Sequence, residues 1–121
     1  MKTVLVIDDD KLTCSIFKKL IERNNAEAVI AKDGQDVDII LKDQKKYNLI
    51  ILDLILPGSS GWDLLDLIKN NPAMKDTPVV IMTAADISTK EREQLLTRVS
   101  AIVDKSTFDT DEFEKMLEQL L

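Results

Sequence analysis

Short apolar runs alternate along the chain with stretches in which apolar residues recur every three or four positions. The runs are rich in valine, isoleucine and leucine, a composition typical of parallel strands buried on both faces. They are Val4–Ile7, Ala28–Ala31, Leu49–Leu52, a run from Pro78 to Met82, and Ala101–Val103. Five such strands separated by helical stretches predict βα units repeated around one parallel sheet.

Capping and turn residues mark where the intervening helices begin and end. The first helix is predicted to end at Asn24-Asn25 and to bury Leu12, Ile16, Phe17, Leu20 and Ile21. The later helices are predicted to start at Asp33-Gly34, after the turn-rich segment Pro57–Gly61, at Ser88 (with Glu91 in capping-box spacing) and at Asp109 (with Glu112).

The length of 121 residues fits one domain, so residues 1–121 are expected to form a single unit. The fold class that we predict is α/β, a flavodoxin-like doubly wound (βα)5 sandwich. In that fold the parallel strands run in the order 2-1-3-4-5, and ligands bind where the winding reverses between strands 1 and 3.

Acidic residues follow two of the apolar runs. Asp8 and Asp9 come directly after the first run and Asp53 after the third, while Thr83 follows the fourth. The predicted strand order brings these three carboxylates together. Clustered acids repel one another, and a hard divalent cation is the commonest reason for such a cluster, so we predict a Mg²⁺ site. The competing interpretation, in which the acids only cap the following helices, is the one that we assign to Asp10.

Charge and composition exclude several other classes. The formal net charge of −6 argues against binding of nucleic acid or of an anionic membrane surface. No apolar stretch approaches the roughly 18 residues of a membrane span, and no signal peptide precedes the first run, so a cytoplasmic protein is expected. The single cysteine, Cys14, is assigned to the core. The absence of histidine excludes imidazole catalysis and means that the chain could only receive a phosphoryl group from a phosphohistidine on another molecule.

Four motifs in register resemble the receiver domain of two-component response regulators, over essentially the whole chain. They are Asp8-Asp9, Asp53 followed by Pro57 and Gly61, Thr83-Ala84, and Lys105 after the last apolar run. The resemblance implies that Asp53 accepts a phosphoryl group from a sensor histidine kinase or a histidine phosphotransfer protein. It also implies that the backbone carbonyl of Ile55 completes the Mg²⁺ ligands provided by the three acids, and that Thr83 and Lys105 contact phosphoryl oxygens.

By the same resemblance, phosphorylation switches the face formed by the fourth strand, the helix after it and the fifth strand. The signal would pass to a downstream protein or a fused output domain, and the chain would catalyse only its own phosphorylation and dephosphorylation. Two residues depart from the family pattern. Ile102 stands where a switching aromatic residue is usual, and Ser106 replaces the proline that follows the lysine. We expect a trans bond before Ser106, because a cis bond there would cost about 2.5 to 4 kcal/mol.

Ile55 and Ala85 occupy the two positions whose side chains can orient a hydrolytic water in relatives. Neither side chain can form a hydrogen bond, so we expect slow self-dephosphorylation, and a polar residue introduced at either position should speed the decay.

Two alternatives stay open from sequence. One is a docking module of the same fold that works without phosphorylation. The other is a haloacid-dehalogenase-like Mg²⁺ phosphatase with Asp8 as nucleophile and Asp10 as acid and base; the short chain and the presence of Leu12 at a position where that class has Thr or Val disfavour it.

Overall fold

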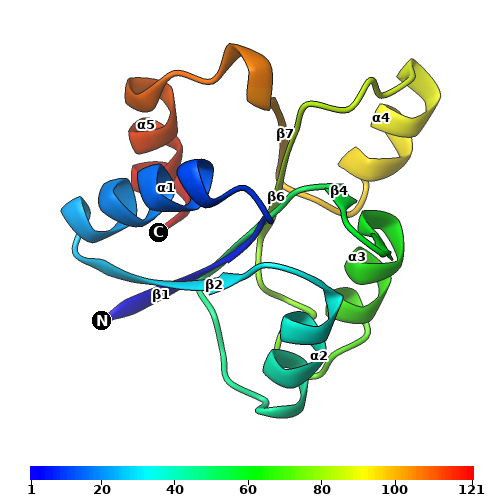
Figure 1. Ribbon diagram of the computed structural model, residues 1–121, viewed down its shortest axis with the longest axis horizontal. Coiled ribbons are helices and arrows are strands. Elements are labelled where there is room, and N and C mark those ends of the chain that lie inside the picture. The colour runs from blue at the N-terminus through cyan, green and yellow to red at the C-terminus, as the bar shows by residue number, and fades with distance from the viewer.

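The predicted apolar runs form one parallel sheet in the computed structural model, which describes residues 1–121 (Figure 1). The strands are β1 (Lys2–Ile7), β2 (Ala26–Ala31), β3 (Leu49–Leu52), β6 (Val79–Thr83) and β7 (Ala101–Asp104). Their order is β2-β1-β3-β6-β7. Because β6 and β7 are the fourth and fifth strands of this sheet, the order is the predicted 2-1-3-4-5.

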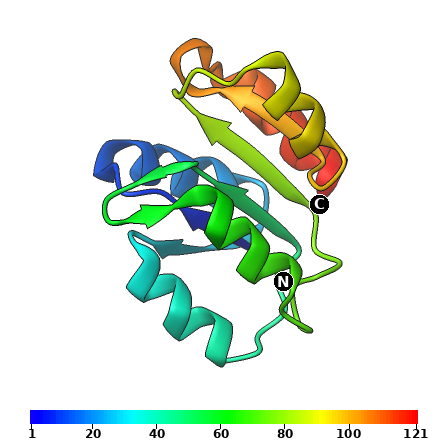
Figure 2. The ribbon, with the colours of Figure 1, turned by 90° about the vertical axis from the view of Figure 1, so that its right-hand side faces the viewer.

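Helices cover both faces of the sheet, as Figures 1 and 2 show. Helices α1 (Lys11–Arg23) and α5 (Thr110–Leu120) pack on one face, and α2 (Gly34–Lys42), α3 (Gly61–Lys69) and α4 (Thr89–Leu96) contribute to the layer on the other. A short 3-10 helix, η1 (Lys105–Thr107), follows β7 and is separated from α5 by Phe108 and Asp109. The doubly wound α/β fold is therefore confirmed. No helix combines the length and apolarity that crossing a membrane requires.

Alternating residues of each strand enter the two apolar layers. In β1, Val4 and Val6 pack in the layer under α1 and α5, whereas Leu5 and Ile7 pack in the layer under α2 and α3. All four side chains are at most 1% exposed. Burial on both faces explains why the strands read as continuous apolar runs rather than as alternating ones.

The predicted helix caps agree with the structure. The side chains of Asp33, Ser88 and Asp109 accept hydrogen bonds from the first turns of α2, α4 and α5, and Ser88 forms a complete capping box with Glu91. Capping satisfies backbone N–H groups that have no partner within the helix.

Two details differ from the sequence predictions. The segment predicted as a turn holds a small antiparallel hairpin of β4 (Ile55–Leu56) and β5 (Ser59–Ser60), whose strands are too short to leave a periodic pattern. Leu12 was predicted on the buried side of α1, and this is wrong, because it is 69% exposed in the first turn of that helix.

Gly61 joins this hairpin to α3. Its backbone N–H donates to the carbonyl oxygen of Leu54 at 3.1 Å, and a Cβ atom at position 61 would lie 2.3 Å from the Leu54 Cα. Only glycine allows this close approach of two backbones. The segment after β3 is thus held directly against the start of α3.

Candidate functional site

The ends of β1 and β3 bring two acidic side chains together. Ile7 and Leu52 are partners in the parallel register, so Asp8 and Asp53 leave neighbouring strands at the same level. Their backbone N–H groups continue the sheet bonding, Asp8 to the Ala31 carbonyl at 3.0 Å and Asp53 to the Ile7 carbonyl at 2.9 Å. The two residues are only 2% and 6% exposed.

Asp9 completes a cluster of three carboxylates. One oxygen from each of Asp8, Asp9 and Asp53 lies within 4.8 Å of the others, and Asp9 faces solvent. Carboxylate oxygens are hard ligands that suit Mg²⁺ or Ca²⁺, and the exposed Asp9 leaves a side open for water ligands. The residues present therefore fit a hard divalent cation. The structure brings together the three acids that the sequence picks out, while their role as metal ligands stays a prediction.

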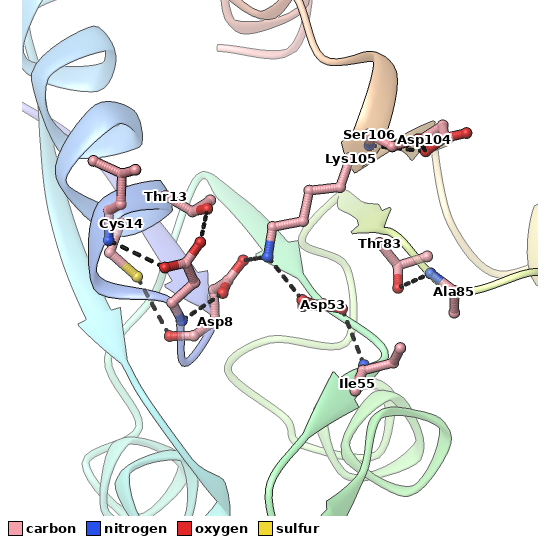
Figure 3. A network of polar contacts seen from close by, with 12 residues as sticks. Asp8, Thr13, Cys14, Asp53, Ile55, Thr83, Ala85, Asp104, Lys105 and Ser106 are labelled. Atoms are coloured by element: carbon pink, nitrogen blue, oxygen red, sulfur yellow. Dashed lines mark hydrogen bonds and ion pairs between the residues drawn. The ribbon is translucent and has the colours of Figure 1, made fainter.

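Lys105 reaches the same cluster from the other end of the chain. Its Nζ donates to Asp8 Oδ2 at 2.8 Å and to Asp53 Oδ2 at 3.0 Å (Figure 3). The lysine side chain is 17% exposed, and the side chains of its two partners are 3% and 7% exposed. One ammonium group thus bridges two nearly buried carboxylates.

The second oxygen of each buried acid is held by the backbone. Asp8 Oδ1 accepts from the N–H of Asp10 at 2.9 Å, and Asp53 Oδ1 accepts from the N–H of Ile55 at 3.0 Å. Each carboxylate is therefore fixed on one side by a main-chain N–H two residues later and on the other by Lys105. This arrangement orients both carboxylates.

Burial and hydrogen bonding shift the pKa values of Asp8 and Lys105 in opposite directions. Burial raises the pKa of Asp8 above its ordinary value, and the hydrogen bond from Lys105 only partly offsets the rise. Burial alone would lower the pKa of Lys105, but the hydrogen bonds to Asp8 and Asp53 prevail and the pKa is raised. The lysine therefore remains positively charged at neutral pH.

The start of α1 borders the site. Asp10 is the N-cap of this helix, as predicted: its carboxylate accepts from the Leu12 N–H at 3.3 Å and from Thr13 Oγ1 at 2.5 Å. The bond from Thr13 lowers the pKa of Asp10. Cys14 is buried, as predicted, and its thiol donates to the Asp8 carbonyl oxygen at 3.3 Å. Burial raises the pKa of Cys14 to about 11, so the thiol is protonated.

Thr83 lies at the end of β6 and is 2% exposed. Its Oγ1 accepts from the Ala85 N–H at 3.2 Å and makes no hydrogen bond to the acidic cluster (Figure 3). Its predicted contact with a phosphoryl group therefore stays a prediction.

Ile55, in β4, is 57% exposed, and Ile102 is half-buried against the apolar layer under α2 and α3.

A local contact around Lys105 was missed from sequence. Asp104 Oδ1 accepts from both the N–H and the Oγ of Ser106, at 2.9 and 2.6 Å. These bonds lower the pKa of Asp104. The chain contains no cis peptide bond, so the bond before Ser106 is trans, as predicted. The spacing Asp-x-Ser is a known turn signal and could have revealed the contact.

The chain is similar to known signalling proteins over most of its length. The family described as the response regulator receiver domain matches residues 4–118. The 3',5'-cyclic-nucleotide phosphodiesterase regA of Dictyostelium discoideum is 30% identical over 88 residues, which are 72% of this chain and 11% of that protein. Protein PilG of Pseudomonas aeruginosa is 34% identical over 83 residues, which are 69% of this chain and 61% of PilG. The chain thus spans less than two thirds of the length of these relatives.

Solved structures give the same result. A signal receiver domain of a two-component histidine kinase from Clostridium thermocellum has a TM-score of 0.87 and 27% identity, covering 99% of this chain and 97% of that one. The response regulator protein TrrA from Thermotoga maritima, solved in complex with Mg²⁺ and BeF, has a TM-score of 0.79 and 27% identity, with each chain covered fully at 100%. The family matches nearly the whole chain, and the acids and Lys105 gather at one end of the sheet. This chain therefore belongs to the response regulator receiver domain family.

Proposed function

We propose that Asp53 is the phosphoacceptor of a two-component system and receives its phosphoryl group from a phosphohistidine in a Mg²⁺-dependent reaction. The observation that carries the proposal is the position of the Asp53 carboxylate, which lies in a cluster of three acids and is bonded to Lys105. A carboxylate beside a fixed cation and further metal ligands is suited to attack on a phosphoryl group, because the negative charges of both reactants need screening.

The proposed metal ligands are the carboxylates of Asp8, Asp9 and Asp53 and the backbone carbonyl of Ile55. The cluster of oxygen donors supports this assignment, as does the Mg²⁺ in the structure of TrrA. When bound, Mg²⁺ would neutralise negative charge on the carboxylates and on the incoming phosphoryl oxygens.

The residues of this chain have separate tasks in the proposed transfer. An Asp53 carboxylate oxygen forms a bond to phosphorus while the bond from phosphorus to the imidazole nitrogen of the donor breaks, and the electron pair of that bond stays on the imidazole. Lys105 Nζ would exchange its contact with Asp53 Oδ2 for a phosphoryl oxygen and keep its contact with Asp8. The Thr83 hydroxyl, at the end of the adjacent strand β6, would donate to another phosphoryl oxygen.

The proposed partners are a sensor histidine kinase or a histidine phosphotransfer protein upstream, and a protein or fused domain that reads the switched face downstream. Movement of Lys105 and Thr83 toward the phosphoryl group would alter β6, α4 and β7, because these residues lie at or just after the ends of β6 and β7. We propose no enzymatic activity beyond phosphorylation and dephosphorylation of Asp53 itself.

The phosphatase alternative is disfavoured by the contacts of Asp10. That reading needs Asp10 as a free acid and base, but its carboxylate caps α1 and its pKa is lowered by the bond from Thr13. The docking-module alternative keeps the same fold, and phosphorylation of Asp53 decides between it and the proposal.

The test is incubation with Mg²⁺ and acetyl phosphate, followed by intact mass spectrometry. One Mg²⁺-dependent phosphoryl adduct is expected on the wild-type chain and none on Asp53→Asn, which keeps the side-chain shape and removes the nucleophile. Omission of Mg²⁺ is the second control. Equal adduct formation in wild type and variant would overturn the assignment of Asp53, and no adduct with either this donor or a phosphorylated histidine phosphotransfer protein would favour the docking module.

A further inference from the structure

Packing in the apolar core does little to fix the position of Lys105. It follows β7, an edge strand whose residues Ala101–Val103 are only half-buried, and it begins the short η1 turn. A lysine side chain has four rotatable bonds and loses substantial entropy when its end is held in one place. Its bridging contact with Asp8 and Asp53 therefore requires a backbone that already points it at the acids.

Local polar contacts fix the backbone on both sides of the Lys105 Cα. Asp104 precedes the lysine and Ser106 follows it, and one carboxylate oxygen of Asp104 accepts from both the backbone N–H and the Oγ of Ser106. The side chain of Asp104 thus closes a ring around the lysine backbone. Because Asp104 is paired with Thr83 in the sheet register, the ring is attached to the end of β6.

Phe108 anchors the far end of the same segment. Its ring packs edge-on against Phe17 of α1 and Phe113 of α5, with ring centroids 5.4 and 5.5 Å apart. The aromatic contacts fix where the segment ends, and the Asp104 ring sets the direction of the turn between the strand and the anchor.

We propose that Asp104 and Ser106 are positioning residues for Lys105, and that their side-chain contact aims its ammonium group at Asp8 and Asp53. This inference rests on the proposed function, since it specifies how the lysine is made ready for phosphoryl transfer. Neither Asp104 nor Ser106 forms a side-chain hydrogen bond with Asp8, Asp9 or Asp53.

Asp109 offers a matched control. It is also exposed and also uses its carboxylate to cap a turn, accepting from the N–H groups of Asp111 and Glu112. Asp109→Ala therefore removes the same kind of contact at the start of α5, without altering the residues on either side of Lys105. Asp104→Asn is the conservative variant, because its Oδ1 can still accept both bonds from Ser106.

The first readout is the rate of Asp53 phosphorylation by acetyl phosphate at fixed Mg²⁺. Asp104→Ala should be about tenfold slower than wild type, less than the roughly 100-fold that a 1 Å misplacement of a reacting group can cost. Asp104→Asn and Asp109→Ala should stay within about twofold of wild type. Ser106→Ala keeps the backbone N–H bond and should lie between these limits. A rate for Asp104→Ala equal to that of Asp109→Ala would overturn the proposal.

The second readout does not depend on phosphorylation. The ¹H–¹⁵N NMR signal of the Lys105 side-chain ammonium, recorded without Mg²⁺, should be visible in wild type and in Asp104→Asn, because its hydrogen bonds slow exchange with water. It should be lost or strongly broadened in Asp104→Ala while the backbone spectrum shows a folded protein. If wild type accepts no phosphoryl group, the proposed function fails, and this comparison alone decides the positioning role. A preserved signal in Asp104→Ala would overturn it.

Discussion

Strands β3 and β7 each deliver one charged residue to the site, and they do so in opposite ways. β3 is a central strand whose residues Leu49–Leu52 are at most 2% exposed, and Asp53 follows it directly. β7 lies at the edge of the sheet, is half-buried, and is followed by Lys105. The carboxylate is placed by the core, whereas the lysine is placed by side-chain contacts that form outside the core.

This difference separates rigid from adjustable parts of one site. Sheet hydrogen bonds and two apolar layers hold the β3 end, so Asp53 cannot move without disturbing the core. The β7 end depends on the Phe108 anchor and on a few exposed polar bonds, and water can replace the polar bonds at a small cost. Phosphoryl transfer would need such a division, since the nucleophile must stay in place while its countercharge moves to a new partner.

The largest expected effect tests the core side of this comparison. Leu52→Ala should reduce the free energy of unfolding by about 2 to 5 kcal/mol, because it leaves a cavity in a fully buried layer. Ile102→Ala on β7 should cost about 1 kcal/mol, since that side chain is half-buried. Urea unfolding monitored by circular dichroism measures both. Equal reductions of the free energy of unfolding in Leu52→Ala and Ile102→Ala would contradict the view that β3 is held by the core more firmly than β7.

A second, smaller effect concerns the lysine itself. Lys105→Met leaves Asp8 and Asp53 buried without their shared cation and should reduce the free energy of unfolding by about 2 kcal/mol, less than a fully buried pair because the lysine side chain is 17% exposed. Mg²⁺ at ten times its dissociation constant should restore about 1.4 kcal/mol. The matched control is Lys115→Met, at an exposed position of α5. Identical stability of the two variants would contradict the bridging role of Lys105.

The smallest effect is a pH dependence on the rigid side of the site. Burial raises the pKa of Cys14 from 9.0 to about 11, so the folded thiol stays protonated where an unfolded one ionises. Stability contributed by the buried thiol is present below pH 9 and declines as the pH rises toward 11. At pH 8 iodoacetamide should alkylate the folded chain about 100-fold more slowly than the urea-unfolded chain. Similar alkylation rates in the folded and unfolded chains would contradict the burial of Cys14 at the start of α1. Cys14→Ser, which has no thiol to alkylate, is the control.

Most of the fold could be predicted because its strands are buried on both faces and therefore stand out as apolar runs. The βα repeat predicted the parallel sheet, and the order of its strands was taken from the flavodoxin-like fold, which brings Asp8, Asp9 and Asp53 together. The β4–β5 hairpin could not be predicted, because two-residue strands have no period. Leu12 fitted the helical period but lies in the first turn of α1, beyond the layer that buries the following turns.

The site was predictable to the extent that it depends on the sheet. Lys105 was selected by family resemblance, since 97 residues separate it from Asp8 and no local pattern links them. Which oxygens it bridges depends on side-chain packing, and so does the contact between Asp104 and Ser106. The roles of Asp53, Thr83 and Lys105 in phosphoryl transfer and of Ile55 as a metal ligand remain predictions.

Gly61 couples the start of α3 to the segment that follows Asp53. Its N–H donates to the carbonyl oxygen of Leu54, the residue after Asp53, and the two backbones lie in close contact. At the other end of the helix, Lys69 donates to the carbonyl oxygen of Thr77 at 3.1 Å, just before β6. A nine-residue helix is about 14 Å long. A shift of the segment that follows Asp53 would therefore be carried along α3 to the start of β6, at the opposite end of the sheet.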